Sequence, residues 1–325
     1  MSALTLALPS KGRLQEQVVG YLADAGLQVK QAAGARGYAA SLAGVDGVNL
    51  MLLSASEIAS ELIAGRVHLG VTGEDLLAES GAGAARVETI EKLGFGRANV
   101  VVAVPRAWID VASMADLDDV AHDFHTLHHR RLRVATKYLT LARDFFGSHG
   151  VADYRIVESL GATEGAPAAG TAEVIVDITT TGATLAANHL KVLDDGLILE
   201  SQAVIAASLR ADWDEGARQA AAGLFGRLAA RQLGKMSYVI RVRIDKAGEK
   251  GLTKLEATLG ARLLAPAETG DEQVSLLVPQ AKLNAAISGL RALGVRGAIT
   301  TQTADYVFLP DDPLTAALRR RLPSA

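Results

Sequence analysis

The sequence has no cysteine, only 8 prolines, and an aromatic content of 4%. Without cysteine the chain forms no disulfide, no thiolate nucleophile, and no Cys-ligated zinc or iron–sulfur site. Aromatic side chains are scarce while hydrophobic residues make up 49% of the chain. We therefore expect cores that are built mainly from aliphatic side chains.

The chain also lacks long apolar runs and a strong excess of either charge. No window approaches the ~20 consecutive apolar residues that a membrane span requires, and residues 1–9 lack the basic start and apolar core of a signal peptide. The formal net charge of −3 argues against a general nucleic-acid-binding protein, which needs a basic face. We expect a cytoplasmic protein that binds neither nucleic acid nor membranes, although a few local cations would suffice for a small phosphorylated ligand.

The length of 325 residues exceeds what one hydrophobic core usually serves and predicts two or three domains. Apolar strands alternate with amphipathic helices through most of the chain, and the spacing predicts strands at 4–8, 67–71, 99–104, 132–135 and 174–178. This order favours an α/β protein with largely parallel sheets. Open sheets of this kind bind ligands beyond the carboxyl ends of their strands.

A long helix is expected at 214–233, and the pattern changes after it. The spacing then predicts strands at 238–244, 273–278, 298–303 and 306–309, with helices at 252–259 and 283–293. We place a domain boundary near Lys235. Residues 235–325 are expected to form a small α+β module of the ferredoxin-like type.

The segment around residue 180 has the composition of a phosphate-binding turn. A hydrophobic strand ends in Asp177, and a run of threonine and glycine precedes a helix. Backbone N–H groups at a helix start attract anions, Gly182 carries no Cβ to keep a phosphate away, and Thr181 and Thr184 can donate hydroxyls. The alternative is a threonine that caps an ordinary helix. Asp177 favours a nucleotide or sugar phosphate, because it can accept from ribose hydroxyls or help to hold Mg²⁺.

Two other turns carry candidate ligand-binding residues. Lys11 and Arg13 follow the strand at 4–8, where two cations and unpaired N–H groups suit a pyrophosphate. The alternative is a pair of solvated surface charges. Gly73 permits a tight turn after the strand at 67–71, and Asp75 can accept hydrogen bonds from a ligand or cap a helix.

The spacing over residues 164–185 is similar to the signature of ATP phosphoribosyltransferases. Its fixed positions are Glu164, Gly170, Ala172, Ile175, Asp177, Ile178, Thr181, Gly182, Thr184 and Leu185. Residues 9–14, 70–75, 93–97 and 135–138 also resemble segments of that family. The sequence departs from it at His68, which stands where an acidic residue is expected, and at Ser54, where an arginine is often found. Residues 263–266 do not reproduce a Pro-Thr segment of the long-form enzymes.

The resemblance implies roles for individual residues. In that family the signature segment holds the 5-phosphate and ribose of phosphoribosyl pyrophosphate, which implies binding by Glu164, Asp177, Thr180, Thr181, Gly182, Ala183, Thr184 and Leu185. The candidates for catalysis are Lys11, Arg13 and Asp177, with Mg²⁺ as cofactor at Asp177. The candidates for the ATP side are Gly73, Asp75, Lys137 and Tyr138, with Lys137 at a phosphate and Tyr138 stacked near the base.

The resemblance also implies a fold and partners. We expect a two-lobed core like that of periplasmic binding proteins, with lobe I at 1–97 plus 187–234, lobe II with the phosphoribosyl site at 98–186, and a C-terminal regulatory domain at 235–325. The expected reaction joins ATP and phosphoribosyl pyrophosphate in the first step of histidine biosynthesis. Histidine is the expected inhibitor, and subunits are expected to form dimers and hexamers.

Two alternatives belong to other functional classes. The chain could be a non-catalytic protein that binds a phosphate ligand, or a regulatory subunit that senses histidine. A regulatory subunit would not need the intact 164–185 segment, so the enzyme is favoured. Four histidines at 122, 125, 128 and 129 lie near acidic residues, but we interpret this segment as a polar loop rather than a metal site.

Overall fold

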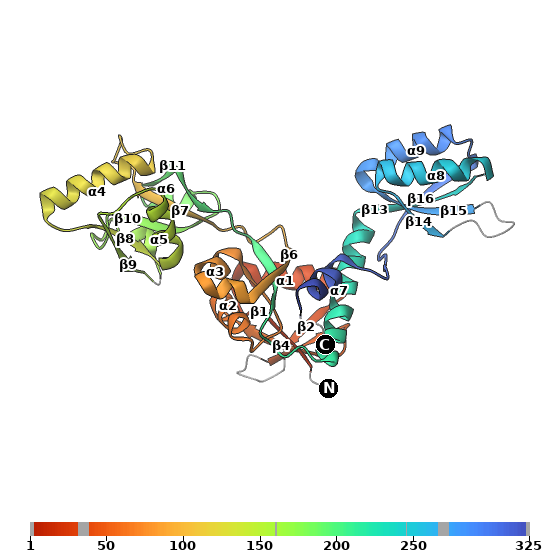
Figure 1. Ribbon diagram of the computed structural model, residues 1–325, viewed down its shortest axis with the longest axis horizontal. Coiled ribbons are helices and arrows are strands. Elements are labelled where there is room, and N and C mark those ends of the chain that lie inside the picture. The colour runs from red at the N-terminus through yellow and green to blue at the C-terminus, as the bar shows by residue number, and fades with distance from the viewer. Residues whose placement is uncertain (1–2, 32–38, 160, 245, 266–272, 323–325) are drawn as a thin grey trace. The chain divides into compact units, whose positions relative to one another are not determined.

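The computed structural model describes residues 3–31, 39–159, 161–244, 246–265 and 273–322 (Figure 1). The chain divides into two compact units. Unit 1 comprises Met1–Tyr21, Gln28–Ala220 and Ala317–Ala325, and unit 2 comprises Leu22–Leu27 and Ala221–Ala316. Among the described residues, no helix is both long and apolar enough to cross a membrane.

The first sheet of unit 1 has seven strands in the order β2-β3-β4-β1-β5-β12-β6. These strands are β1 (Leu4–Pro9), β2 (Gln28–Gln31), β3 (Ala39–Ala43), β4 (Val48–Leu53), β5 (Leu69–Gly73), β6 (Val87–Lys92) and β12 (Ala203–Ser208). The central strand β1 pairs in parallel with β4 and β5. Helices α1 (Gly12–Asp24), α2 (Ala55–Ala64) and α3 (Glu74–Glu79) begin just after β1, β4 and β5, so three helix starts lie at the carboxyl edge of this sheet.

Local sequence signals explain why α2 has these limits. The hydroxyl of Ser54 accepts from the N–H of Glu57, whose carboxylate accepts from the N–H of Ser54, and this capping box defines the start. Gly65 ends the helix in the left-handed conformation that glycine adopts readily. Ile58 and Leu62 on its inner face are completely buried against the sheet.

The second sheet of unit 1 has five strands in the order β11-β7-β10-β8-β9. They are β7 (Asn99–Pro105), β8 (Leu132–Thr136), β9 (Tyr154–Glu158), β10 (Val174–Thr179) and β11 (Leu190–Leu199). Helices α4 (Met114–His128) and α5 (Leu139–Ser148) pack on one face, and Figure 1 shows them beside this sheet. The short 3₁₀ helix Thr163–Gly165 precedes β10, and α6 (Ala183–Ala187) follows it, with Ala166 and Leu185 in the core of the opposite face.

The expectation of largely parallel sheets was wrong, because both sheets are mixed and most of the described strand pairs in unit 1 are antiparallel. β12 runs antiparallel to β5 and β6, and β7 runs antiparallel to β10 and β11. Continuous apolar runs indicate burial but carry no information on strand direction. Strand β11 belongs to the second sheet, whereas its residues were expected in the lobe with 1–97; the domain boundaries otherwise stay predictions.

The histidine-rich segment is helix α4 rather than the expected polar loop. Ser113 and Asp116 form a capping box at its start, and His129 ends it in the left-handed conformation. His122 and His125 each direct Nδ1 toward the carboxylate of Asp153, at 3.5 and 3.0 Å. These contacts give the two histidines a structural partner on the surface.

Unit 2 contains most of α7 (Glu215–Lys235), from Ala221 onward, and a four-stranded antiparallel sheet in the order β14-β15-β13-β16. The elements run β13 (Ser237–Arg243), α8 (Lys246–Leu259), β14 (Arg262–Ala265), β15 (Gln273–Pro279), α9 (Leu283–Ala292) and β16 (Arg296–Thr303). This βαββαβ order is the ferredoxin-like arrangement, as expected. Helices α8 and α9 cover one face (Figure 1). The strand expected at 306–309 is irregular chain, and α10 (Pro313–Arg321) follows it.

Candidate active site

A cavity of about 550 Å³ in unit 1 lies where the carboxyl ends of both sheets meet. Arg13 follows β1, Gly73 ends β5, and Lys137 follows β8. Thr180, just after β10, completes this side of the lining. The cavity therefore occupies the position at which open α/β sheets bind ligands, and of the predicted site residues it brings together Arg13, Gly73, Asp75, Lys137 and Thr180.

The loop after β10 is held by its own hydroxyl groups. The N–H of Gly182 donates to the hydroxyl of Thr179 at 2.8 Å, and the hydroxyl of Thr180 donates to the carbonyl of Arg97 at 3.0 Å. Gly182 has a φ of +75°, and no atom lies within 4 Å of the position where a Cβ would be. Glycine is needed there for its backbone conformation, and the open space above it leaves room for a ligand.

Two expectations about this loop need correction. Helix α6 has only five residues, so the helix dipole contributes less to anion binding than expected. Leu185 is 3% exposed and packs in the core with Ala166 and Ile175, which removes its side chain from the ligand-binding set. Thr181, Ala183 and Thr184 are exposed and stay predictions.

Asp177 is half-buried at the end of β10, with Glu164 and Lys137 close enough to act on it. Its Oδ1 accepts from the N–H of Ile178 at 2.8 Å. Burial raises the pKa of the Asp177 carboxyl and the charge of Glu164 adds to this, whereas the Ile178 N–H and the Lys137 ammonium lower it. A half-buried carboxyl with a raised pKa is stabilised in its charged form by any cationic ligand group or metal ion that approaches it.

Three cations line the cavity: Arg13, Arg97 and Lys137. Their spacing around one cavity suits a ligand with several phosphate oxygens. Lys11 is exposed and does not contribute to the described lining; its charge acts on Glu57 in α2. Arg97 had no predicted role, although it ends the family-like segment 93–97.

Asp75 and Tyr138 form a buried hydrogen-bonded pair. The Tyr138 hydroxyl donates to Oδ2 of Asp75 at 2.6 Å, and the Ser201 hydroxyl donates to Oδ1 at 2.8 Å. Tyr138 is 0% exposed, so the expectation that its ring stacks on a base is wrong for this structure. Asp75 does not cap α3 either, since Gly73 is the N-cap and its cap has no side-chain hydrogen bond.

The two residues that depart from the family both have structural roles. His68 Nδ1 accepts from the N–H of Thr5 at 3.0 Å, Nε2 lies 2.9 Å from the carbonyl of Asp212, and the ring packs edge-on against Trp213. His68 precedes β5 and therefore lies at the opposite end of that strand from Gly73. Ser54 caps α2.

Comparison with known proteins identifies the family. The family described as ATP phosphoribosyltransferase matches residues 54–229. The protein named ATP phosphoribosyltransferase from Nitrobacter winogradskyi is 52% identical over 314 residues, covering 96% of each chain. The one from Bradyrhizobium diazoefficiens is 52% identical over 320 residues, covering 98% of each chain.

The chain belongs to the ATP phosphoribosyltransferase family. It is therefore a transferase, as the resemblance of residues 164–185 predicted. A solved structure, the "ATP phosphoribosyl transferase (HisG:HisZ) complex from Thermotoga maritima", is 23% identical, with a TM-score of 0.53, and covers 69% of this chain and 95% of that one. At this identity the likeness extends to the fold alone.

Asp177 and Glu164 are not among the described residues that line the cavity, although Asp177 directly precedes the lining residue Ile178. The two carboxylates suit a metal ion that is shared with a ligand. Asp177 and Glu164 supply two carboxylates, and within the described ranges no group of three or more His, Cys, Asp or Glu could hold a metal by itself. Mg²⁺ characteristically takes one or two carboxylates and completes its shell with phosphate oxygens and water. A Mg²⁺ ion bound together with a pyrophosphate therefore fits these residues.

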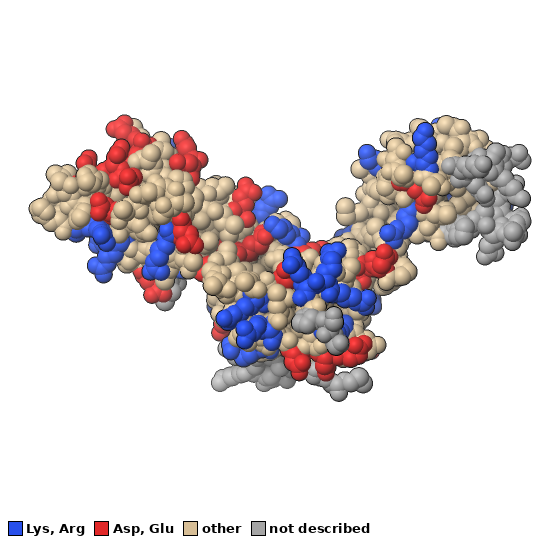
Figure 2. All heavy atoms as spheres, viewed as in Figure 1, with Lys and Arg blue, Asp and Glu red and all other residues tan. Residues whose placement is uncertain are grey.

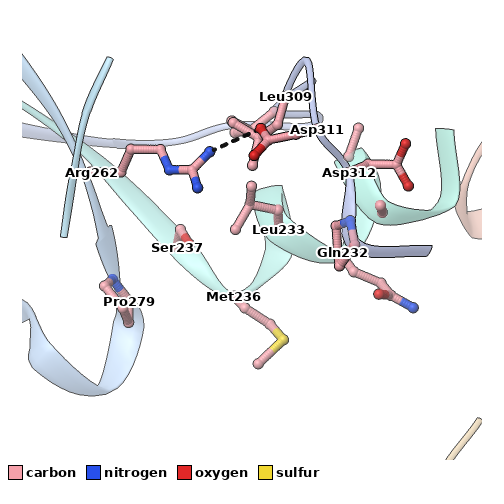
Figure 3. Close-up of a pocket in the computed structure, with 13 residues that line it drawn as sticks. Gln232, Leu233, Met236, Ser237, Arg262, Pro279, Leu309, Asp311 and Asp312 are labelled. Carbon is pink, nitrogen blue, oxygen red and sulfur yellow. Dashed lines mark ion pairs between the residues drawn. The ribbon is translucent and has the colours of Figure 1, made fainter. Parts of the chain in front are cut away.

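A second cavity, of about 440 Å³, lies within unit 2 between the end of α7, the first residues of β13 and β14, and the segment 307–313. Figure 3 shows Arg262 pointing toward Asp311, with Met236 and Leu233 on the wall. The Arg262–Asp311 distance is 3.8 Å and both side chains are largely exposed. The wall is mostly apolar, in contrast to the cationic wall in unit 1.

Charged side chains of both signs are interspersed on the described part of the face shown in Figure 2. This distribution agrees with the small formal net charge of −3. The cations at the cavity of unit 1 supply the local positive charge that would attract a phosphorylated ligand.

Proposed function

We propose that unit 1 transfers the 5-phosphoribosyl group from phosphoribosyl pyrophosphate to N1 of the adenine of ATP, releasing pyrophosphate, in the first step of histidine biosynthesis. Membership of the family supports the reaction. The observation that carries the assignment to this site is the cavity in which Arg13, Arg97 and Lys137 face the loop that follows Asp177.

In this arrangement the carboxyl edges of the two sheets would bind different groups of the ligands. On the side of β10, the loop 179–185 would hold the 5-phosphate, and Asp177 would accept from the ribose hydroxyls. Arg13, with Lys11 nearby, would bind the pyrophosphate end. Gly73 and Asp75 would border the ATP side, and Lys137 and Arg97 would neutralise phosphates between the two ligands.

The chemistry needs positioning and charge neutralisation more than a proton-transfer group. The bond from ribose C1 to pyrophosphate oxygen breaks, the new bond forms from adenine N1 to C1, and the leaving pyrophosphate keeps the electron pair. The ribose becomes oxocarbenium-like, as in glycoside hydrolysis, and the Asp177 carboxylate would stabilise this positive charge. Holding two polyanions together requires cations around them.

Mg²⁺ would bind at Asp177 together with pyrophosphate oxygens. Bound there, it would neutralise leaving-group charge and orient the substrate. Glu164 would support this role, because its negative charge raises the pKa of Asp177 and a shared cation would relieve the repulsion between the two carboxylates. The two-lobed architecture of unit 1, with the ligand between lobes like those of periplasmic binding proteins, is part of the same proposal.

Regulation and assembly belong to the proposal as well. We assign feedback inhibition by histidine to the ferredoxin-like module of unit 2, which lies beyond the segment matched by the family. The enzyme would act in the cytoplasm as dimers and hexamers. Light scattering of the protein with and without histidine would measure the assembly state.

The experiment that tests the function is a direct transfer assay. The protein is mixed with ATP, phosphoribosyl pyrophosphate and Mg²⁺, and the N1-substituted adenine is followed by ultraviolet absorbance. We expect product that requires both substrates. If a parallel binding measurement shows that both ligands bind while no product forms, the chain is a binding protein instead. Adding histidine to the same assay tests the assignment of inhibition.

A further inference from the structure

A polar network lies beneath the cavity, between α3 of the first sheet and the start of α5 on the second sheet. Asp75 and Glu79 are four positions apart on α3 and therefore share one face of the helix. Both carboxylates bind the segment that begins at Tyr138.

Both oxygens of the Asp75 carboxylate are occupied. Oδ1 accepts from the Ser201 hydroxyl at 2.8 Å and Oδ2 accepts from the Tyr138 hydroxyl at 2.6 Å. The Ser201 oxygen in turn accepts from the N–H of Asp75 at 3.0 Å. Asp75 is only 5% exposed, so loss of either partner would leave a buried polar atom without compensation.

Glu79 binds the same segment at the residues that follow Leu139. Its Oε1 accepts from the N–H of Thr140 at 2.9 Å, and its Oε2 accepts from the N–H of Leu141 at 3.1 Å. These N–H groups belong to the first turn of α5, where an anion is stabilised by the helix dipole. The two carboxylates of α3 thus fix both Tyr138 and the helix that follows it.

Tyr138 is the contact between this network and the cavity. Its ring is completely buried, and its N–H donates to the hydroxyl of Thr136 at 2.9 Å. The Lys137 ammonium lies 4.9 Å from the centre of the ring, a cation–π contact. Burial and then the charge of Asp75 raise the pKa of Tyr138, so its hydroxyl remains a donor.

We propose that Tyr138 is a positioning residue: by its hydrogen bond to Asp75 it fixes the ring on which the Lys137 ammonium rests, and thereby sets where Lys137 meets the phosphates in the cavity. The proposal rests on the proposed function only for the nature of the ligand. In this proposal Tyr138 does not stack on a base but positions Lys137 from beneath the cavity. Asp75 and Ser201 then act through Tyr138, and Glu79 fixes the start of the helix that follows it.

The test is a double-mutant cycle with Tyr138→Phe and Lys137→Met in the transfer assay. Tyr138→Phe removes one oxygen, and we expect kcat/KM for phosphoribosyl pyrophosphate to fall roughly tenfold in the wild-type background. In the Lys137→Met background the same change should alter kcat/KM by less than about twofold, because the residue that it positions is already gone. Additive losses in the two backgrounds would overturn the proposal.

Controls separate positioning from stability and from the function itself. Tyr154→Phe makes the same change on β9, where the ring packs on Phe146, and should leave kcat/KM unchanged. Thermal unfolding is measured for every variant. If Tyr138→Phe does not fold, Ser201→Ala, which removes the other partner of Asp75, enters the same cycle with the same expectation. An inactive wild type would reject the proposed function, whereas an active wild type with additive losses rejects positioning alone.

Discussion

The two ends of β10 carry carboxylates in opposite states. Glu173, just before the strand, accepts from the backbone N–H of Arg133 at 2.8 Å and from the guanidinium groups of Arg133 and Arg130 at 2.6 and 3.1 Å. Burial would raise the pKa of Glu173, but these hydrogen bonds outweigh it and lower the pKa to about 2. Asp177, near the other end, has a raised pKa because burial is offset only by the Ile178 N–H and the more distant Lys137.

Strand β5 repeats the contrast. At its amino end both ring nitrogens of His68 have partners within the protein, while at its carboxyl end Gly73 and Asp75 line the cavity. Polar groups at the amino edge of these sheets are satisfied internally and stabilise the fold. At the carboxyl edge Arg13, Gly73 and Lys137 line the cavity, which lies where the topology of open α/β sheets predicts a ligand. Asp75 also lines it, but both of its carboxylate oxygens are bound by Tyr138 and Ser201.

The largest effect is expected from Asp177→Asn. Removing the carboxylate beside the developing positive charge should lower kcat by about a hundredfold or more, measured by ultraviolet absorbance in the transfer assay. Asp144→Asn, an exposed change on α5, is the matched control and should keep wild-type kcat. Wild-type turnover by Asp177→Asn would remove this residue from the mechanism.

Asp177→Asn should raise the folding stability although it lowers kcat. Because the folded-state pKa of Asp177 is raised, its contribution to stability is present below the unfolded value near 3.8 and is lost as pH rises through the folded pKa. Without ligands, Asp177→Asn should therefore resist urea better than the wild type at pH 7. The difference should shrink toward pH 3, and a less stable variant at pH 7 would contradict the assignment.

A second pair of variants separates the two cations that lie on either side of Gly12. Arg13 lines the cavity and Lys11 does not. Arg13→Ala should raise KM for phosphoribosyl pyrophosphate about tenfold to a hundredfold, the loss expected for a hydrogen bond to a charged group. Lys11→Ala should have a clearly smaller effect. Equal effects in steady-state kinetics would mean that Lys11 also reaches the ligand.

Glu173→Gln should give the reverse profile of Asp177→Asn. Losing the charge at the amino end should destabilise the protein by about 1.5–3 kcal/mol in urea unfolding at pH 7 while leaving kcat intact. Because the pKa of Glu173 is lowered to about 2, its stabilisation is present above the unfolded value of 4.5 and lost as pH falls toward 2. A loss of kcat without a loss of stability would contradict the contrast between the carboxylates at the two ends of β10.

Gly182→Ala tests the loop at the carboxyl edge more gently. The left-handed φ of +75° should cost an alanine about 1 kcal/mol of folding stability. Gly147→Ala in α5 is the matched control, since its surroundings are equally open and its φ is not in the left-handed region. That change should stabilise the protein by about 0.5 kcal/mol, so the two midpoints in urea should move in opposite directions.

The smallest effect is expected in unit 2. The Arg262–Asp311 pair is exposed and 3.8 Å apart, so Arg262→Ala should change stability by less than about 1 kcal/mol. Transfer activity without histidine should equal that of the wild type. A large loss of basal activity would show that the apolar cavity of unit 2 takes part in the reaction.

Much of the fold could be predicted from the sequence where a local pattern decides it. The strands at 4–8, 132–135 and 174–178 were placed to within a residue or two, because continuous apolar runs between turns are strong signals. Helix α4 was missed although Ser113 and Asp116 have capping-box spacing, because charged residues and histidines obscured its apolar side. The strand directions and the placement of β11 in the second sheet could not be predicted, because they depend on pairing between distant segments.

The residues of the candidate site likewise fall into those that local motifs predict and those that depend on contacts between distant segments. The loop after Asp177, and the positions of Arg13 and Lys137, follow from motifs that are local in sequence. Ser201 binds Asp75 across 126 positions, and no local pattern could indicate that contact. The burial of Tyr138 likewise results from packing between distant elements, which the resemblance of residues 135–138 to the family could not reveal when it implied a stacking role.

Hydrogen exchange of the full chain, with and without phosphoribosyl pyrophosphate and Mg²⁺, tests the contrast between the two edges most directly. We predict that the ligand slows exchange at the carboxyl edge, in residues 10–14, 73–76, 136–141 and 178–185. Exchange at the amino edge, in residues 66–69 and 130–134, should not change. Protection confined to the amino edge or to unit 2, with residues 178–185 unaffected, would contradict the account.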